Sequence, residues 1–161
     1  MKFEILLNKG LGPLHFGATP EEVKALLGNP TVSDELVRIS EFAMRWVYEF
    51  PKLSLLFHVG GVFGLDAHAS GEKRLYLIGT TSEDVTLLGE AIFGRRIESV
   101  LALLKLNCVG HVVEQEEFMS EKCFSFPDSN LNIYVANGIV SNIQWAFGNS
   151  AERSAGSVLE L

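Results

Sequence analysis

The chain has 161 residues, of which 47% are hydrophobic and 20% are charged, and its formal net charge is −7. That length suits one domain with its own core, which needs no metal or disulfide to fold. An acidic chain without clusters of Lys and Arg does not suit nucleic-acid binding, and no apolar stretch reaches the length of a membrane span. We therefore expect a globular protein that binds neither nucleic acid nor membrane.

The first ten residues, MKFEILLNKG, predict a lone strand at 2–7. Their apolar run is too short for a secretory signal peptide, and no lipid-attachment cysteine follows. We therefore expect a cytoplasmic location. Cys108 and Cys123 have no metal-ligand spacing, so we expect both to be reduced, packed thiols and expect no cofactor.

The stretch GATPEEVKALLGNP, residues 17–30, carries the signals of a short helix. Thr19 is a candidate N-cap before Pro20, and Glu22 can complete a capping box. Val23, Leu26 and Leu27 fall on one face at helical spacing, which predicts the buried side. Gly28 and Pro30 end the helix.

Alternating apolar residues predict strands after this helix. Residues 42–50 alternate with a period of two, which makes Phe42, Met44, Trp46, Tyr48 and Phe50 a core face. In residues 53–69 apolar side chains occupy odd-numbered positions both before and after Gly60 and Gly61. This pattern predicts a hairpin that turns at the two glycines and has one buried face. Residues 31–40 and 107–116 have no clear pattern, and a second lone strand is expected at 74–79.

The first helix region returns later in the chain. Residues 11–27 and 88–104 are identical at nine of seventeen positions, among them Phe16/Phe93, Gly17/Gly94 and Val23/Val100. Such self-similarity indicates an internal duplication. The second copy predicts a helix from about Arg96 to Lys105, with a weaker cap because Arg96 replaces Thr19.

The strands of the second copy follow the same plan. Residues 124–126 alternate, and an Asn137–Gly138 turn joins two strands whose apolar face carries Leu131, Ile133, Val135, Ile143 and Trp145. We predict an α+β fold of two tandem helix(-helix)-β-β-β repeats, with helices on one face of antiparallel sheet. The repeats would span 1–72 and 73–148, followed by a loose tail at 149–161.

The helix signature resembles that of the BamE/SmpA-type repeat family. The matching positions are Gly17, Thr19, Glu22, Val23, Leu27, Gly28 and Pro30. The tandem build is similar to the β-lactamase-inhibitor-protein type, which implies a protein that binds an enzyme on the outer face of its sheet. A small, acidic, duplicated module is also similar to bacterial immunity-type proteins, which implies neutralisation of a toxin by protein–protein binding.

Two groups of residues are candidates for partner binding. Charge is concentrated in the second half, where Glu114, Glu116, Glu117 and Glu121 could dock a basic protein or could simply be solvated. Asn132, Tyr134 and Asn142 are predicted on the polar face of the second sheet, and exposed Tyr is common among interface anchors.

His58, Asp66 and His68 form the best remaining polar cluster, on the polar face of the predicted 53–69 hairpin. They could be a metal or acid–base site, a partner-binding patch, or hydrogen-bonded strand neighbours. No catalytic motif is present.

We therefore expect a non-enzymatic inhibitor of a basic toxin or enzyme that is a monomer or weak homodimer. The alternative is a small-ligand-binding protein or metal-dependent enzyme with a site between the repeats.

Overall fold

The computed structural model describes residues 2–35, 43–59, 71–114, 117 and 120–148. These residues form two helices, a short 3-10 turn and two sheets, so the α+β class expected from the sequence is confirmed. The smaller sheet has five strands in the order β3-β2-β1-β8-β9. Its strands are β1 (Phe3–Leu6), β2 (Gly10–Leu11), β3 (Leu14–His15), β8 (Val85–Leu87) and β9 (Glu90–Ala91).

The larger sheet has eight antiparallel strands in the order β10-β11-β12-β13-β7-β6-β5-β4. Two runs of neighbouring strands meet at the pair β7–β13 in its middle. The short turn η1 (Pro127–Ser129) links β11 to β12. The strands are β4 (Val32–Glu35), β5 (Ala43–Tyr48), β6 (Leu53–His58), β7 (Arg74–Thr80), β10 (Val113–Glu114), β11 (Glu121–Phe126), β12 (Leu131–Ala136) and β13 (Ile139–Ala146).

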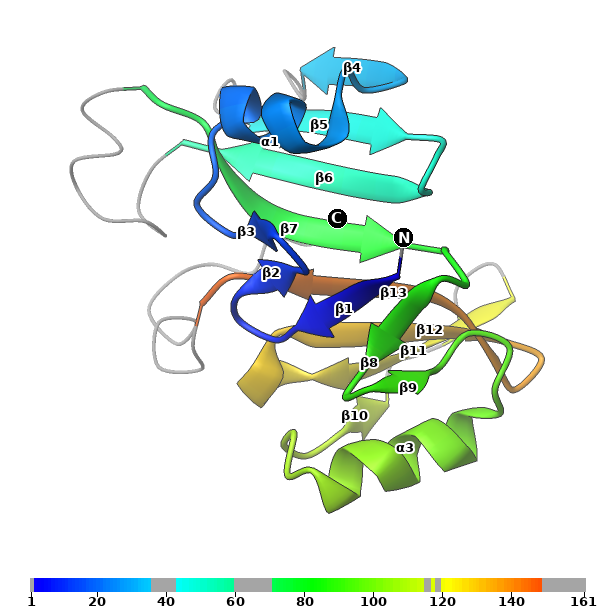
Figure 1. Ribbon diagram of the computed structural model, residues 1–161. Coiled ribbons are helices and arrows are strands. Elements are labelled where there is room, and N and C mark those ends of the chain that lie inside the picture. Colours follow the sequence, from blue (N-terminus) through cyan, green and yellow to red (C-terminus); the bar gives the residue numbers. More distant parts are fainter. Residues whose placement is uncertain (1, 36–42, 60–70, 115–116, 118–119, 149–161) are drawn as a thin grey trace.

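Among the described residues, the small sheet and both helices lie on one side of the large sheet (Figure 1). One hydrophobic cluster joins the layers: it includes Val23 of the first helix, Val100 of the second, Leu87 of the small sheet and Ile133 of the large one. The indole nitrogen of Trp145 also donates to the carbonyl oxygen of Gly10 at 3.0 Å. The opposite face of the large sheet is the outer face.

The two helices begin as their sequences predict. Helix α1 (Pro20–Leu27) has a complete capping box between Thr19 and Glu22, and Gly28 follows it at φ 79°. Helix α3 (Ile97–Leu106) starts after Arg96, which makes no side-chain cap. Both predicted helices are confirmed, including the weaker cap of the second.

The segment before each helix is bonded to a strand of the large sheet. Before α1, the amide of Gly17 donates to Leu75 and the amide of Leu75 donates to Ala18. Before α3, the amide of Gly94 donates to Val140 and that of Val140 donates to Arg95. These backbone bonds place the start of α1 on β7 and the start of α3 on β13.

Three local predictions need correction. The prediction that residues 53–58 form the first strand of a 53–69 hairpin is wrong. These residues form β6, and both of its edges are already paired, one with β5 and the other with β7. The second half of that hairpin, at 60–70, lies outside the described residues. Phe50 is 81% exposed, because β5 ends at Tyr48 and Phe50 belongs to the turn. Cys108 is exposed, whereas Cys123 is buried as expected.

Candidate protein-binding face

Polar side chains gather on the outer face of β11, β12 and β13. Strand alternation sends Phe124, Ile133 and Ile143 into the core, and their neighbours in sequence take the outer face. The register then aligns Ser125 with Asn132, and Asn132 with Gln144. We call this group the outer-face cluster; it consists of Glu121, Cys123, Ser125, Asn132, Tyr134, Ser141, Asn142 and Gln144.

Hydrogen bonds hold part of the outer-face cluster in one arrangement. The hydroxyl of Ser125 donates to Oδ1 of Asn132 at 2.8 Å, and the hydroxyl of Tyr134 donates to Oε1 of Gln144 at 3.3 Å. The Gln144 side chain lies against the backbone of Gly79 on β7, where a Cβ would come within 3.3 Å of its Cγ. Glycine at this position therefore lets Gln144 lie close to the sheet.

A β-bulge adds Ser141 to the same face. The register between β12 and β13 shifts after the Tyr134–Asn142 pair, which leaves Ser141 as an extra residue. Its hydroxyl lies 2.9 Å from Oε1 of Glu121 and 3.1 Å from the carbonyl oxygen of Tyr134, and it can donate to either. Bulges commonly redirect a side chain in this way. The bulge thus connects the acidic end of β11 to β12 and β13.

The thiol of Cys123 and the phenol of Tyr134 are both held in their neutral forms. Burial raises the pKa of the Cys123 thiol, although hydrogen bonds with Ser125 and Tyr134 oppose part of that rise. Burial also raises the pKa of Tyr134, and the neighbouring Cys123 and Glu121 raise it further. Cys123 is therefore a poor nucleophile at neutral pH. The cluster offers hydrogen-bond donors and acceptors rather than reactive groups.

The structure brings together four of the residues singled out from the sequence. Asn132, Tyr134, Asn142 and Glu121 are all half-buried on the outer face of adjacent strands. Glu117 is exposed. Glu114 belongs to the edge strand β10, where its backbone pairs with Phe124, and Glu116 lies outside the described residues.

The histidine cluster expected from the sequence is only partly within the described residues. His58 ends β6 opposite Arg74, and its ring centre lies 6.3 Å from that of Tyr76. Asp66 and His68 lie outside the described residues. Within 2–35, 43–59, 71–114, 117 and 120–148, no three His, Cys, Asp or Glu side chains are grouped to hold a metal ion.

Sequence reasoning missed three members of the outer-face cluster. Cys123 and Ser125 alternate with core residues, so the pairing of β11 with β12 would have identified them. Ser141 has no such signal, because a bulge changes the parity of its strand. His111 also gained a partner not evident in the sequence, since its Nδ1 lies 2.9 Å from Oδ2 of Asp128.

Comparison with known proteins gives one structural likeness. No family model and no curated protein match the chain. A solved structure of an extracellular protein containing an SCP domain, from Bacillus anthracis str. Ames, is 13% identical with a TM-score of 0.50. The match covers 89% of this chain and 50% of that one, so the chain spans about half the length of the protein it resembles.

Two expectations are corrected by these comparisons. The resemblance to BamE/SmpA-type repeats, inhibitor-type proteins and immunity-type proteins is wrong: no family model matches, and the likeness found is to a protein of another description. Its helix motif specifies only where a helix starts and stops, and unrelated folds share those signals. The expected cytoplasmic location is also contradicted, because the matched protein is extracellular. Within the described residues, no helix has the length and apolar composition of a membrane crossing.

Proposed function

We propose that this chain is a non-enzymatic protein-binding module that inhibits a toxin or an enzyme by covering part of its surface. The observation that carries the proposal is the outer-face cluster, a set of buried and half-buried polar side chains on three adjacent strands. Such a face suits a protein partner because it offers many hydrogen-bonding groups without a reactive one.

Tyr134 is the proposed anchor of this face. It is half-buried, its hydroxyl donates to Gln144, and its register partner on β13 is Asn142. Tyrosine is enriched among residues that dominate binding energy, and side chains that are already ordered lose less entropy on association. Contacts at the centre of the cluster should therefore contribute most to affinity.

Charge supports a basic partner. Residues 81–161 carry 11 acidic and 5 basic side chains, whereas residues 1–80 carry 9 and 8. Within the outer-face cluster Glu121 accepts a hydrogen bond from Ser141, and Glu117 is exposed just before β11. Negative potential at one end of a binding face speeds the approach of a cationic partner and weakens as salt rises.

We also propose that the scaffold is a tandem duplication. In its favour, Gly17 and Gly94 occupy matching positions in the sequence repeat. The segment that starts at each of them makes the same pair of backbone hydrogen bonds to a strand of the large sheet, β7 for Gly17 and β13 for Gly94. The order of strands in the large sheet supports it as well. Outward from β7 come β6, β5 and β4, and outward from β13 come β12, β11 and β10, so both halves run outward in reverse chain order. The outer-face cluster lies on the second of these halves alone.

The test compares two charge reversals of equal size. A single partner is first identified by affinity capture at low salt from both cell extract and culture medium, since the structurally similar protein is extracellular. Its affinity is then measured for Glu117→Lys and for Glu21→Lys, an exposed glutamate on α1 in the other half. The proposal expects Glu117→Lys to weaken binding by roughly fivefold and Glu21→Lys to leave it unchanged at low salt.

A second pair of variants tests the anchor. Tyr134→Ala should weaken binding by tenfold or more, on the order of a hot-spot residue. Ser54→Ala, on the outer face of β6 in the first half, is the control. Circular dichroism establishes that each variant is folded. Equal affinity for all four variants and the wild type would show that the outer-face cluster is not the binding surface.

A further inference from the structure

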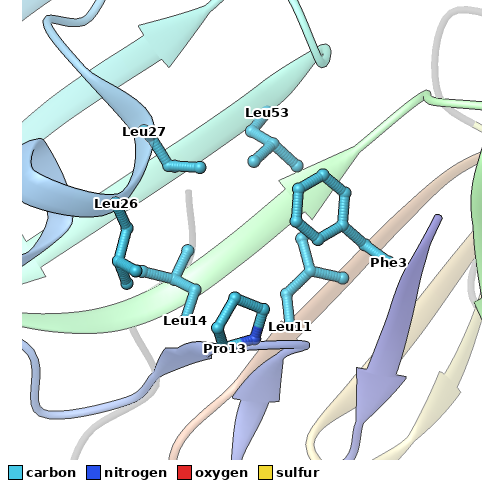
Figure 2. A pocket seen from close by; sticks show the side chains of 7 residues that line it. All are labelled: Phe3, Leu11, Pro13, Leu14, Leu26, Leu27 and Leu53. Atoms are coloured by element: carbon cyan, nitrogen blue, oxygen red, sulfur yellow. The ribbon is translucent and has the colours of Figure 1, made fainter. Parts of the chain in front are cut away.

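A small apolar cavity lies beneath α1, away from the outer-face cluster. Its volume is about 120 Å³. Figure 2 shows side chains of three elements pointing into it: the small sheet, α1 and the start of β6. The lining residues other than Pro13 are Phe3, Leu11, Leu14, Leu26, Leu27 and Leu53.

The cavity exists because Leu26 and Leu27 of α1 are not buried in the core as Val23 is. Val23 is the buried residue of α1, whereas α3 buries Ile97, Val100 and Leu104. Leu104 is fully buried, but Leu27, at the matching position of the sequence repeat, lines the cavity instead. The prediction that Leu26 packs into the core is therefore wrong, since it is 51% exposed.

The rim of the cavity reaches the surface. Leu26 and Pro13, both lining residues, are exposed, so a small molecule can enter between the end of α1 and the β2–β3 turn. An exposed leucine beside an unfilled apolar cavity is unfavourable in water, and an apolar guest would remove both defects.

We propose that this cavity is a binding site for a small hydrocarbon group, such as a six-carbon ring or a chain of about four to six carbons. Cavities of about 150 Å³ lined by Leu, Ile and Phe stay dry and bind benzene or xenon, and this one is of similar size. All seven lining residues are apolar, so the cavity selects against charged groups. The site would take the apolar end of a ligand whose polar end stays in water beside Leu26.

The probes are benzene and 1-hexanol, which test the ring and the chain, added to the full chain labelled with ¹³C at leucine methyl groups. The expected result is a saturable shift of the methyl signals of Leu26, Leu27 and Leu53, with Leu103 unmoved. Leu103 is the matched reference because it packs against the core from α3 and does not line the cavity. Shifts without saturation, or spread evenly over all leucines, would overturn the proposal.

Variants that change the volume of the cavity complete the test. Leu27→Phe should fill the space and weaken the binding of both probes by about tenfold or more, while Leu103→Phe should leave it unchanged. Leu27→Ala should enlarge the cavity and change the affinity for both probes, whereas Leu103→Ala should not, so this pair decides the matter if Leu27→Phe does not fold. Equal binding by Leu27→Phe and the wild type would place the probes elsewhere and refute the site.

Discussion

Trp145 and Trp46 are both buried in the large sheet, yet only the indole of Trp145 has a hydrogen-bond acceptor among the described residues. Its nitrogen donates to Gly10 at 3.0 Å and so joins the two sheets, whereas that of Trp46 has no partner there. Replacing each tryptophan should therefore lower the free energy of unfolding by a different amount.

Trp145→Phe should destabilise the protein more than Trp46→Phe, by about 1–3 kcal/mol. Both changes remove similar volume, but the first also removes a hydrogen bond to the carbonyl of Gly10, whereas the second removes a buried donor that lacks an acceptor among the described residues. Urea unfolding followed by circular dichroism gives both values without relying on tryptophan fluorescence. Equal costs would mean that the bond between Trp145 and Gly10 contributes nothing to stability.

The two helix starts give a second matched pair. Thr19→Ala removes the hydroxyl that accepts the hydrogen bond from the amide of Glu22 and should lower the free energy of unfolding by about 1 kcal/mol. Arg96→Ala removes no cap, and its ion pair with Glu98 is exposed, so the change should be close to zero. Chemical denaturation of both variants measures the difference. A loss from Arg96→Ala as large as that from Thr19→Ala would contradict this account of the caps.

Stability should fall at alkaline pH because of Cys123. Burial raises the pKa of its thiol, so the folded protein holds this proton more tightly than the unfolded chain does. This contribution is fully present below about pH 8, and it is lost as pH rises through the thiol pKa of the unfolded chain toward that of the folded protein. The free energy of unfolding, measured in urea from pH 7 to pH 10, should therefore decline less for Cys123→Ala than for the wild type. Identical slopes would argue against the raised pKa.

The two cysteines should react at very different rates. Cys108 is exposed and Cys123 is buried, so iodoacetamide at pH 8 should modify Cys108 quickly and Cys123 only when the protein unfolds. Mass spectrometry of peptides after timed labelling separates the two sites, and labelling in urea provides the control in which both react. Equal rates in native conditions would mean that the face around Cys123 is open to solvent.

The elements predicted well from the sequence are those with local signals. Thr19, Glu22 and Gly28 define α1 within one turn at each end, and Asn137 and Gly138, both at positive φ, form the turn between β12 and β13. Alternation in residues 131–136 placed Asn132 and Tyr134 on the face opposite the core. These signals depend on neighbours in the chain, which the sequence shows directly.

The features missed depend on contacts between distant segments. Strands β2, β3 and β9 have two residues each, which is too short for any periodicity. The parallel pairing of β1 with β8 is non-local, as is the position of β7 between β6 and β13. The cavity under α1 also depends on Leu53 of β6, which is distant in the sequence from the other lining residues.

The strand order of the large sheet has a consequence for how the chain folds. Within β4–β7 and within β10–β13, each strand pairs with the next along the chain, but the pair β7–β13 and the pair β1–β8 close long loops. Loop-closure entropy makes such long-range pairings slow compared with hairpins between successive strands. We therefore expect the outer strands to order first and the middle of the sheet to close last, so that the slowest step of folding joins the two halves of the molecule.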